Sequence, residues 1–394
     1  MSFDPALIRA SFAVVERRAD QLAKYFYVHL FAHSPELRRL FPAELTEQRD
    51  RLFHALTELV LRLEQPGELT EYLRALGRDH RKFRTTAEHY PAVGSSLIAA
   101  LRHFSGHSWT QEIEKAWTEA YTVISQTMIA AAEADTVAPV WWEAEVTDRR
   151  RAAPDLVVLT LRPDQPYPYV AGQYLSLSSP RLPRLWRSYT IAGAPRGDGT
   201  LELHVRRVFG GRLSSALVND VLPGEKLLLG PPIGDTVLDP RSDRPLLAVA
   251  GGTGWATVKA LIEQLARGRA RSATVFLAAR QDADQYDLPA VRALVAEHAW
   301  LEVVLAAPED GAEREAAVDL LRTGLRHGSD WSGHDIYLSG PPDLAPELAE
   351  LLVELHAEPG LIRYDPAPLT ARSGRPLSSS EWFLTPRAAP WARQ

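Results

Sequence analysis

The part of this 394-residue chain that most limits its fold is an apolar run followed at once by small residues. Residues 245–250 read Pro-Leu-Leu-Ala-Val-Ala, and Gly-Gly-Thr-Gly follows at 251–254. An unbroken apolar run is typical of a strand buried on both faces, as in a parallel sheet. A helical pattern then runs from 256 to 266, so the order predicts strand, tight turn and helix. Backbone N–H groups at such a helix start can bind a phosphate, although a tight turn also needs glycine for geometry alone.

Beyond this turn the chain alternates between strand-like and helix-like segments. Strands are expected at 273–278, 301–306 and 335–338, with a helix at 288–296. This alternation predicts a doubly wound parallel sheet. The segment Tyr-Leu-Ser-Gly-Pro-Pro at 337–342 would then end a strand at the carboxyl edge, where ligands of such folds bind.

The middle of the chain has short β-like segments broken by Gly and Pro, at 156–161, 173–177 and 201–205. Their spacing predicts an antiparallel barrel or sandwich. Arg-Ser-Tyr-Thr at 187–190 offers a cation for a pyrophosphate and a ring for stacking. Gly-Gly-Arg-Leu-Ser-Ser at 210–215 is a second glycine turn before a short helix and a second candidate for binding phosphate.

The first third reads as helical, because apolar residues recur three and four apart with few β-branched clusters. Long helices are expected at 47–64 and 110–133. Ser34-Pro35 and Tyr90-Pro91 look like helix starts, since proline is favoured at the first helical position.

Composition removes several classes of function. Lys and Arg number 44 against 50 Asp and Glu, a net charge of −6, which argues against a nucleic-acid binder. The chain has no cysteine, so disulfides, iron–sulfur clusters and cysteine nucleophiles are excluded. We expect a cytoplasmic protein without a membrane span, because no signal-peptide layout and no apolar stretch of about 20 residues is present. The oligomeric state is left open.

The order of motifs from about 140 to 368 resembles the ferredoxin–NADP reductase-like flavin reductases. The resemblance implies FAD and NAD(P)H as cofactors. It implies these FAD contacts: Arg187, Tyr189, Thr190, Gly211, Leu213 and Ser214. It implies these contacts to the nicotinamide dinucleotide: Gly252, Thr253, Gly254, Arg280, Ser339, Gly340 and Pro341.

The first third resembles the globin part of the flavohemoglobins, on Tyr-Phe-Tyr-Val-His…Ser-Pro-Glu-Leu at 25–37, Glu-Gln-Arg-Asp-Arg-Leu at 47–52 and the histidine segment at 77–94. The resemblance implies one heme b with six residues around it. These are His80 as the iron ligand with Tyr90 as its neighbour, Tyr27 and Gln48 as donors to bound O2, and Phe41 and Leu52 as packing residues. His80 alone would pass for an ordinary helix-end histidine.

Together these resemblances imply a multidomain enzyme. An all-α globin domain (1–136) would precede an antiparallel β-barrel FAD-binding domain (137–243), an α/β doubly wound NAD(P)-binding domain (244–369) and a mobile tail (370–394). The implied activity is that of an NAD(P)H-dependent nitric oxide dioxygenase. In it, NAD(P)H reduces FAD, FAD reduces heme iron, and oxy-heme converts NO to nitrate. Its partners are the small molecules O2, NO and NAD(P)H.

Several positions differ from the family pattern. Ala132 stands where the family places a glutamate, and Glu133 should point elsewhere because one residue turns a helix by about 100°. Asp79 replaces a basic residue, Ser339 a cysteine and Thr257 a proline. Two alternatives therefore stay open: an NAD(P)H-dependent heme or flavin reductase or oxidase with little dioxygenase activity, and a heme-based gas or redox sensor.

Overall fold

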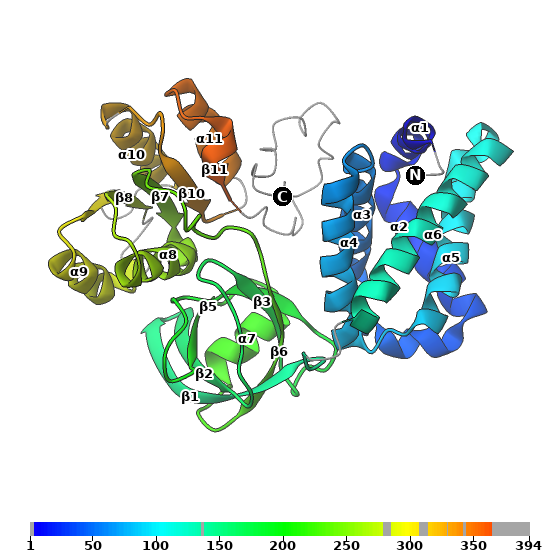
Figure 1. The fold of residues 1–394 in the computed structure, drawn as a ribbon. Coiled ribbons are helices and arrows are strands. Elements are labelled where there is room, and N and C mark those ends of the chain that lie inside the picture. The colour runs from blue at the N-terminus through cyan, green and yellow to red at the C-terminus, as the bar shows by residue number, and fades with distance from the viewer. Residues whose placement is uncertain are drawn as a thin grey trace. The chain divides into compact units, whose positions relative to one another are not determined.

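The computed structural model describes residues 4–134, 138–278, 285–306, 314–328, 330–341 and 344–364. The chain folds into two compact units, a helical unit that ends at Trp141 and a second unit that begins at Trp142 (Figure 1). Arg280 and the tail from 370 lie outside the described residues.

The helical unit has six α-helices among its described residues, and its all-α character agrees with the sequence pattern. They are α1 (Pro5–Glu16), α2 (Ala19–His33), α3 (Thr46–Leu61), α4 (Pro66–His80), α5 (Tyr90–Ser105) and α6 (Gln111–Ala134). Short 3₁₀ turns are η1 (Pro35–Leu40), η2 (Arg81–Phe83), η3 (Ala87–His89) and η4 (Gly106–Ser108). Proline opens η1 and stands in the first turn of α5, which confirms both expected starts.

Two glycines let helices of this unit approach α6 very closely. A Cβ on Gly77 of α4 would lie 2.3 Å from the backbone oxygen of Met128. A Cβ on Gly94 of α5 would lie 2.4 Å from the ring of Tyr121. Both approaches are possible only without a side chain, so α4 and α5 have fixed positions on α6.

The second unit begins with an antiparallel barrel. Its elements are β1 (Trp142–Ala153), β2 (Leu156–Pro163), β3 (Tyr174–Ser178), β4 (Arg187–Thr190), β5 (Leu201–Arg206), α7 (Arg212–Asn219) and β6 (Lys226–Ile233). The strand order is β4-β3-β6-β1-β2-β5. Ile191, next to β4, forms a bridge to Leu203 in β5. This bridge joins the two outer strands, so the sheet is a barrel and not an open sandwich.

A parallel sheet with helices follows. Its elements are β7 (Leu246–Gly251), η5 (Gly252–Gly254), α8 (Trp255–Arg267), β8 (Ala273–Ala278), α9 (Leu288–Glu297), β9 (Leu301–Ala306), α10 (Arg314–His327), β10 (Asp335–Ser339), α11 (Leu344–Glu354), η7 (Pro359–Leu361) and β11 (Ile362–Arg363). The strand order is β11-β10-β7-β8-β9, all parallel. Every residue of β7 is buried, because one face packs on α8 and α9 and the other on α10 and α11. The expected doubly wound sheet is confirmed.

Helix α8 also faces the barrel. Leu156 and Val158 of β2 belong to the same apolar cluster as Trp255 and Leu261 of α8. Nearby, Ala260 packs on two barrel alanines, at 171 and 194. The barrel and the parallel sheet therefore share a continuous core through this helix.

Candidate cofactor sites

Tyr27 of α2 lies among aromatic residues near the start of α3. Its side chain is buried, and its hydroxyl donates to the backbone oxygen of Gln48 at 3.3 Å. Its ring meets the edge of Phe41 at 5.5 Å between centroids. Leu52, one turn after Gln48, packs on the same core cluster. The structure thus places Tyr27 beside Phe41 and the backbone of Gln48, with Leu52 packed on the same helical core.

His80 is the last residue of α4, and one of its ring nitrogens is already engaged. Its Nδ1 lies 2.8 Å from the backbone oxygen of Leu76, one turn earlier, and can donate to it. The ring of Phe83 meets it edge-on at 5.9 Å. Burial lowers the pKa of His80, although the nearby Asp79 charge opposes this shift. A lowered pKa favours the neutral imidazole. A neutral imidazole with Nδ1 engaged presents Nε2 as the atom that can bind a metal.

Arg51 connects these two groups of residues. Burial raises the pKa of Tyr27, and the Arg51 charge opposes this shift. Burial lowers the pKa of Arg51 in turn, and the Asp79 charge opposes that shift. The Arg51 charge thus acts on Tyr27, and the charge of Asp79, the residue before His80, acts on Arg51. The sequence interpretation did not single out Arg51, because a charged residue on α3 reads as solvent-exposed.

The expected FAD residues of the Arg-Ser-Tyr-Thr segment form strand β4. Arg187 and Tyr189 are two positions apart and therefore share one face of the strand, whereas Thr190 lies on the other. Arg187 donates to the backbone oxygen of Trp186 at 2.9 Å. Burial raises the pKa of the Tyr189 phenol, and the Arg187 charge opposes this shift. A cation and a ring side by side suit a pyrophosphate and a flat ring system.

The second glycine turn opens α7, as expected. Gly211 is the N-cap of this helix, and Leu213 and Ser214 lie buried in its first turn. The Ser214 hydroxyl accepts from the amide of Val208 at 3.1 Å and donates to the Gly211 oxygen at 3.2 Å. Ser214 therefore holds the loop in shape, while the first amides of α7 lack acceptors within the helix and can bind an anion.

The two loops expected to bind the dinucleotide meet at the carboxyl edge of the parallel sheet. A Cβ on Gly254 would lie 2.3 Å from the backbone oxygen of Ser339, and one on Gly340 would lie 3.2 Å from the amide of Gly251. Gly252 has φ +55°, which favours glycine, and Thr253 completes the η5 turn. Pro341 packs close to Gly251.

Comparisons with known proteins agree with this architecture. Residues 24–128 match the Globin family, and residues 143–237 match the Oxidoreductase FAD-binding domain family. A flavohemoprotein of Chromobacterium violaceum is 27% identical over 367 residues, 85% of this chain and 90% of that protein. A flavohemoprotein of Bacillus subtilis is 24% identical over 383 residues, 91% and 95% of the two chains. The flavohemoglobin of Malassezia yamatoensis, solved with bound FAD and heme, has the same fold, with a TM-score of 0.73 at 19% identity over 92% of this chain and 97% of that one.

The chain combines a globin domain with an FAD-binding reductase domain and is similar to flavohemoproteins over most of its length. It is an NAD(P)H-dependent flavoheme oxidoreductase with heme, FAD and NAD(P)H as its cofactors. Among the described residues, no helix has the length and apolarity to cross a membrane.

The residues present fit a heme. In residues 4–134, the contacts of His80 leave its Nε2 without a hydrogen-bond partner. A single neutral imidazole is the protein ligand that a globin heme requires. Elsewhere in the described chain, His, Cys, Asp and Glu form no group of three that could hold a metal ion. The donor set therefore suits iron already held by a porphyrin better than a bare metal ion.

Two residues that differ from the family pattern, Asp79 and Glu133, affect the surroundings of His80. Both carboxylate oxygens of Asp79 accept from Lys82 Nζ, at 2.6 and 2.8 Å, and Lys82 is buried. The acidic residue is thus matched by a cation three positions later. Glu133 is exposed on α6, as expected from its offset, so the Nδ1 of His80 has a carbonyl partner and not a carboxylate. Tyr90 is partly buried, and its backbone oxygen accepts from the Tyr121 hydroxyl at 2.7 Å.

Ser339 and Thr257, the two residues that differ from the family pattern at the loops expected to bind the dinucleotide, contact each other. The Ser339 hydroxyl donates to the Thr257 hydroxyl at 3.0 Å. Thr257 is buried in the first turn of α8, so this bond connects the end of β10 to the helix that follows the glycine turn. A proline at 257 or a cysteine at 339 would remove or weaken this hydroxyl pair.

Proposed function

We propose that the chain is a nitric oxide dioxygenase that uses NAD(P)H and O2 to convert NO to nitrate. When bound, the dinucleotide supplies two electrons, FAD passes them on singly, and heme carries out the reaction of O2 with NO. The protein's own residues position these groups and control the polarity around them.

In this proposal His80 holds the heme through Nε2, and the Leu76 carbonyl fixes the plane and tautomer of its ring. Phe41 and Leu52 exclude water on the opposite side. Tyr27 and Gln48 supply hydrogen-bond donors there, which stabilise negative charge that develops on a diatomic ligand.

The observation that carries the proposal is the state of the Tyr27 hydroxyl. It is buried, and its bond to the Gln48 backbone is long, at 3.3 Å. A long neutral hydrogen bond is weak, so the hydroxyl can turn to a ligand at little cost. Burial also raises its pKa, which keeps it protonated and able to donate.

The test is NADH-dependent NO consumption by the full-length holoenzyme, with nitrate measured as the product. Loss of one preorganised donor reduces catalysis by about 100-fold or more in comparable sites, so Tyr27→Phe should decrease nitrate formation to that extent. Tyr25→Phe is the matched control, because Tyr25 lies on the same helix but stacks on His103 at 4.4 Å. NO consumption without nitrate, or equal rates in both variants, would contradict the proposal.

A second candidate is an NAD(P)H oxidase or reductase with little dioxygenase activity. The exposed position of Glu133 favours it, because His80 then has only a carbonyl partner and donates less electron density to iron. Superoxide or peroxide formed at a rate well above that of nitrate, in the presence of NO, would identify this activity.

A further inference from the structure

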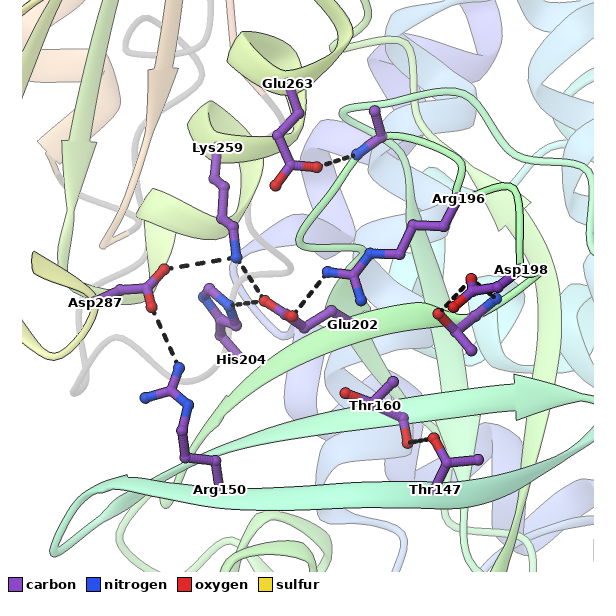
Figure 2. Close-up of polar contacts among 12 residues, drawn as sticks. Thr147, Arg150, Thr160, Arg196, Asp198, Glu202, His204, Lys259, Glu263 and Asp287 are labelled. Atoms are coloured by element: carbon purple, nitrogen blue, oxygen red, sulfur yellow. Dashed lines mark hydrogen bonds and ion pairs between the residues drawn. The ribbon is translucent and has the colours of Figure 1, made fainter. Parts of the chain in front are cut away.

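A group of charged and polar side chains, most of them buried or partly buried, lies where the barrel meets α8 (Figure 2). We call it the interdomain cluster. It comprises Arg150, Arg196, Glu202, His204, Lys259 and Asp287. The first four belong to the barrel, and the last two belong to the parallel-sheet domain. No residue of the cluster is among the expected cofactor contacts.

Three contacts of the cluster cross from one domain to the other. The Nζ atom of Lys259 lies 2.6 Å from Oε1 of Glu202. In the second contact, Arg150 donates to Asp287 at 3.2 Å. The third joins Nδ1 of His204 to the hydroxyl of Tyr286, 2.7 Å apart.

Contacts within each domain hold these side chains in place. Glu202 also accepts from Arg196 at 2.9 Å and lies 2.8 Å from Nε2 of His204. A neutral His204 with its proton on Nε2 satisfies both of its contacts, because it donates to Glu202 and accepts from the Tyr286 hydroxyl. Asp287 accepts from the Trp255 indole at 2.9 Å.

Three of the four charged side chains in these crossing contacts are largely buried, whereas Arg150 is 50% exposed. The side chains of Lys259, Glu202 and Asp287 are 9%, 12% and 6% exposed. Water cannot readily replace these partners, and a buried charge that loses its partner is strongly unfavourable. Ionic and hydrogen-bonded contacts are also directional, so they are satisfied over a narrower range of orientations than apolar packing.

Lys259 stands close to the dinucleotide loop. It is the fifth residue of α8, which begins directly after η5. At about 1.5 Å per residue, the two are about one turn apart along the helix axis. One turn further on, Glu263 accepts from the barrel amide of Ala194 at 3.1 Å. The same face of α8 therefore contacts the barrel from its first turns onward.

We propose that Lys259 is a positioning residue for flavin reduction. By bridging Glu202 of the barrel and Asp287 of its own domain, it sets the orientation of α8, and so of the 252–254 loop, relative to barrel strand β4, which bears Arg187 and Tyr189. The inference depends on the oxidoreductase assignment and not on the reaction proposed for the heme.

The test compares Lys259→Met with wild type as the full-length holoenzyme under anaerobic conditions. We expect normal FAD and heme content and an NADH dissociation constant within about twofold. The limiting rate of flavin bleaching should decrease about 10- to 100-fold, because a misplacement of about 1 Å has effects of this size. Lys259→Arg, which keeps the charge, should recover most of the rate.

Amide hydrogen exchange of the cofactor-free chain gives a readout independent of turnover. In Lys259→Met, the Ala194 amide and the barrel-facing part of α8 should exchange faster. The matched control is Arg271→Met, because the Arg271–Asp335 pair is equally buried at 2.6 Å but lies entirely within the parallel-sheet domain. It should lose stability without a change in limiting rate or in Ala194 exchange.

The double variant Lys259→Met/Glu202→Gln separates positioning from stability. It leaves no unpaired buried charge at this contact, so it should regain thermal stability while its flavin bleaching stays slow. If Lys259→Met does not retain FAD, the double variant is tested in its place. A wild-type limiting rate in the double variant, or a decrease in Lys259→Met no larger than in Arg271→Met, overturns the proposal.

Discussion

The closest backbone approach at the nicotinamide edge gives a sharp prediction for Gly254→Ala. The added Cβ would lie 2.3 Å from the Ser339 oxygen and 2.7 Å from the Gly340 amide, whereas ordinary contact begins at 3.4 Å. Both neighbours are backbone atoms, so no side chain can turn away. The loop and the end of β10 must separate by roughly 1 Å.

The size of the effect follows from this displacement. Overpacking of this kind costs about 1–3 kcal/mol. Because the two loops meet where the dinucleotide is expected, we expect the cost to reappear as NADH binding weakened by about 5- to 150-fold. Gly252→Asn should be much milder, because Gly252 has open space around it and asparagine tolerates its φ of +55°.

The assay is anaerobic flavin bleaching of the full-length protein across a range of NADH concentrations. FAD and heme content are measured first, so that a binding defect is not confused with misfolding. Gly197→Ala is the control, since a Cβ there meets nothing within 4 Å and its φ is not left-handed. An unchanged NADH dissociation constant in Gly254→Ala would refute the reasoning from backbone contact.

Three further predictions concern other parts of the molecule. His80→Ala should lose the Soret absorbance of the reconstituted protein, whereas His89→Ala, in a 3₁₀ capping box, should keep it; an equal loss in both would contradict the assignment of the ligand. Ser214→Ala removes two hydrogen bonds of the α7 loop, so FAD retained after dialysis should decrease, consistent with about 1–3 kcal/mol; full retention would contradict this role. Burial raises the pKa of Glu202, but His204 and Lys259 outweigh it and hold the pKa well below its ordinary 4.5. The carboxylate therefore stabilises the fold above about pH 4.5, and this contribution is lost as the pH falls further. The difference in unfolding free energy between wild type and Glu202→Gln should stay constant from pH 8 to about 5 and become smaller below that pH. If this free-energy difference disappeared between pH 8 and 6, the pKa of Glu202 could not be shifted downward.

Much of the fold could be predicted because its signals are local. The unbroken apolar run of β7 indicates burial on both faces, and that is what the six buried residues show. The meeting of the loops at Gly254 and Ser339 follows from the rule that parallel strands end at one edge. The neighbourhood of Tyr27, Phe41 and Gln48 was expected only from the family resemblance.

Other features could not be predicted, because their causes are distant in sequence. The contact between Glu202 and Lys259 joins residues 57 positions apart, and each alone looks like a surface charge. The bounds of strand β1 were not predicted, since a run of charges from Asp148 to Arg151 and a register shift after Val146 hide its alternation.

The close approach of Gly77 to Met128 has a consequence for how this protein acquires its cofactor. Helix α4 lies on α6 without an intervening side chain, three residues before the imidazole of His80. The chain's own packing, together with the Leu76 carbonyl, orders this ring. The conformational entropy of ordering the ligand is therefore lost during folding and not when the porphyrin enters. Cofactor-free protein should already be helical at α4, so that heme capture resembles docking into a prepared site more than folding around a ligand.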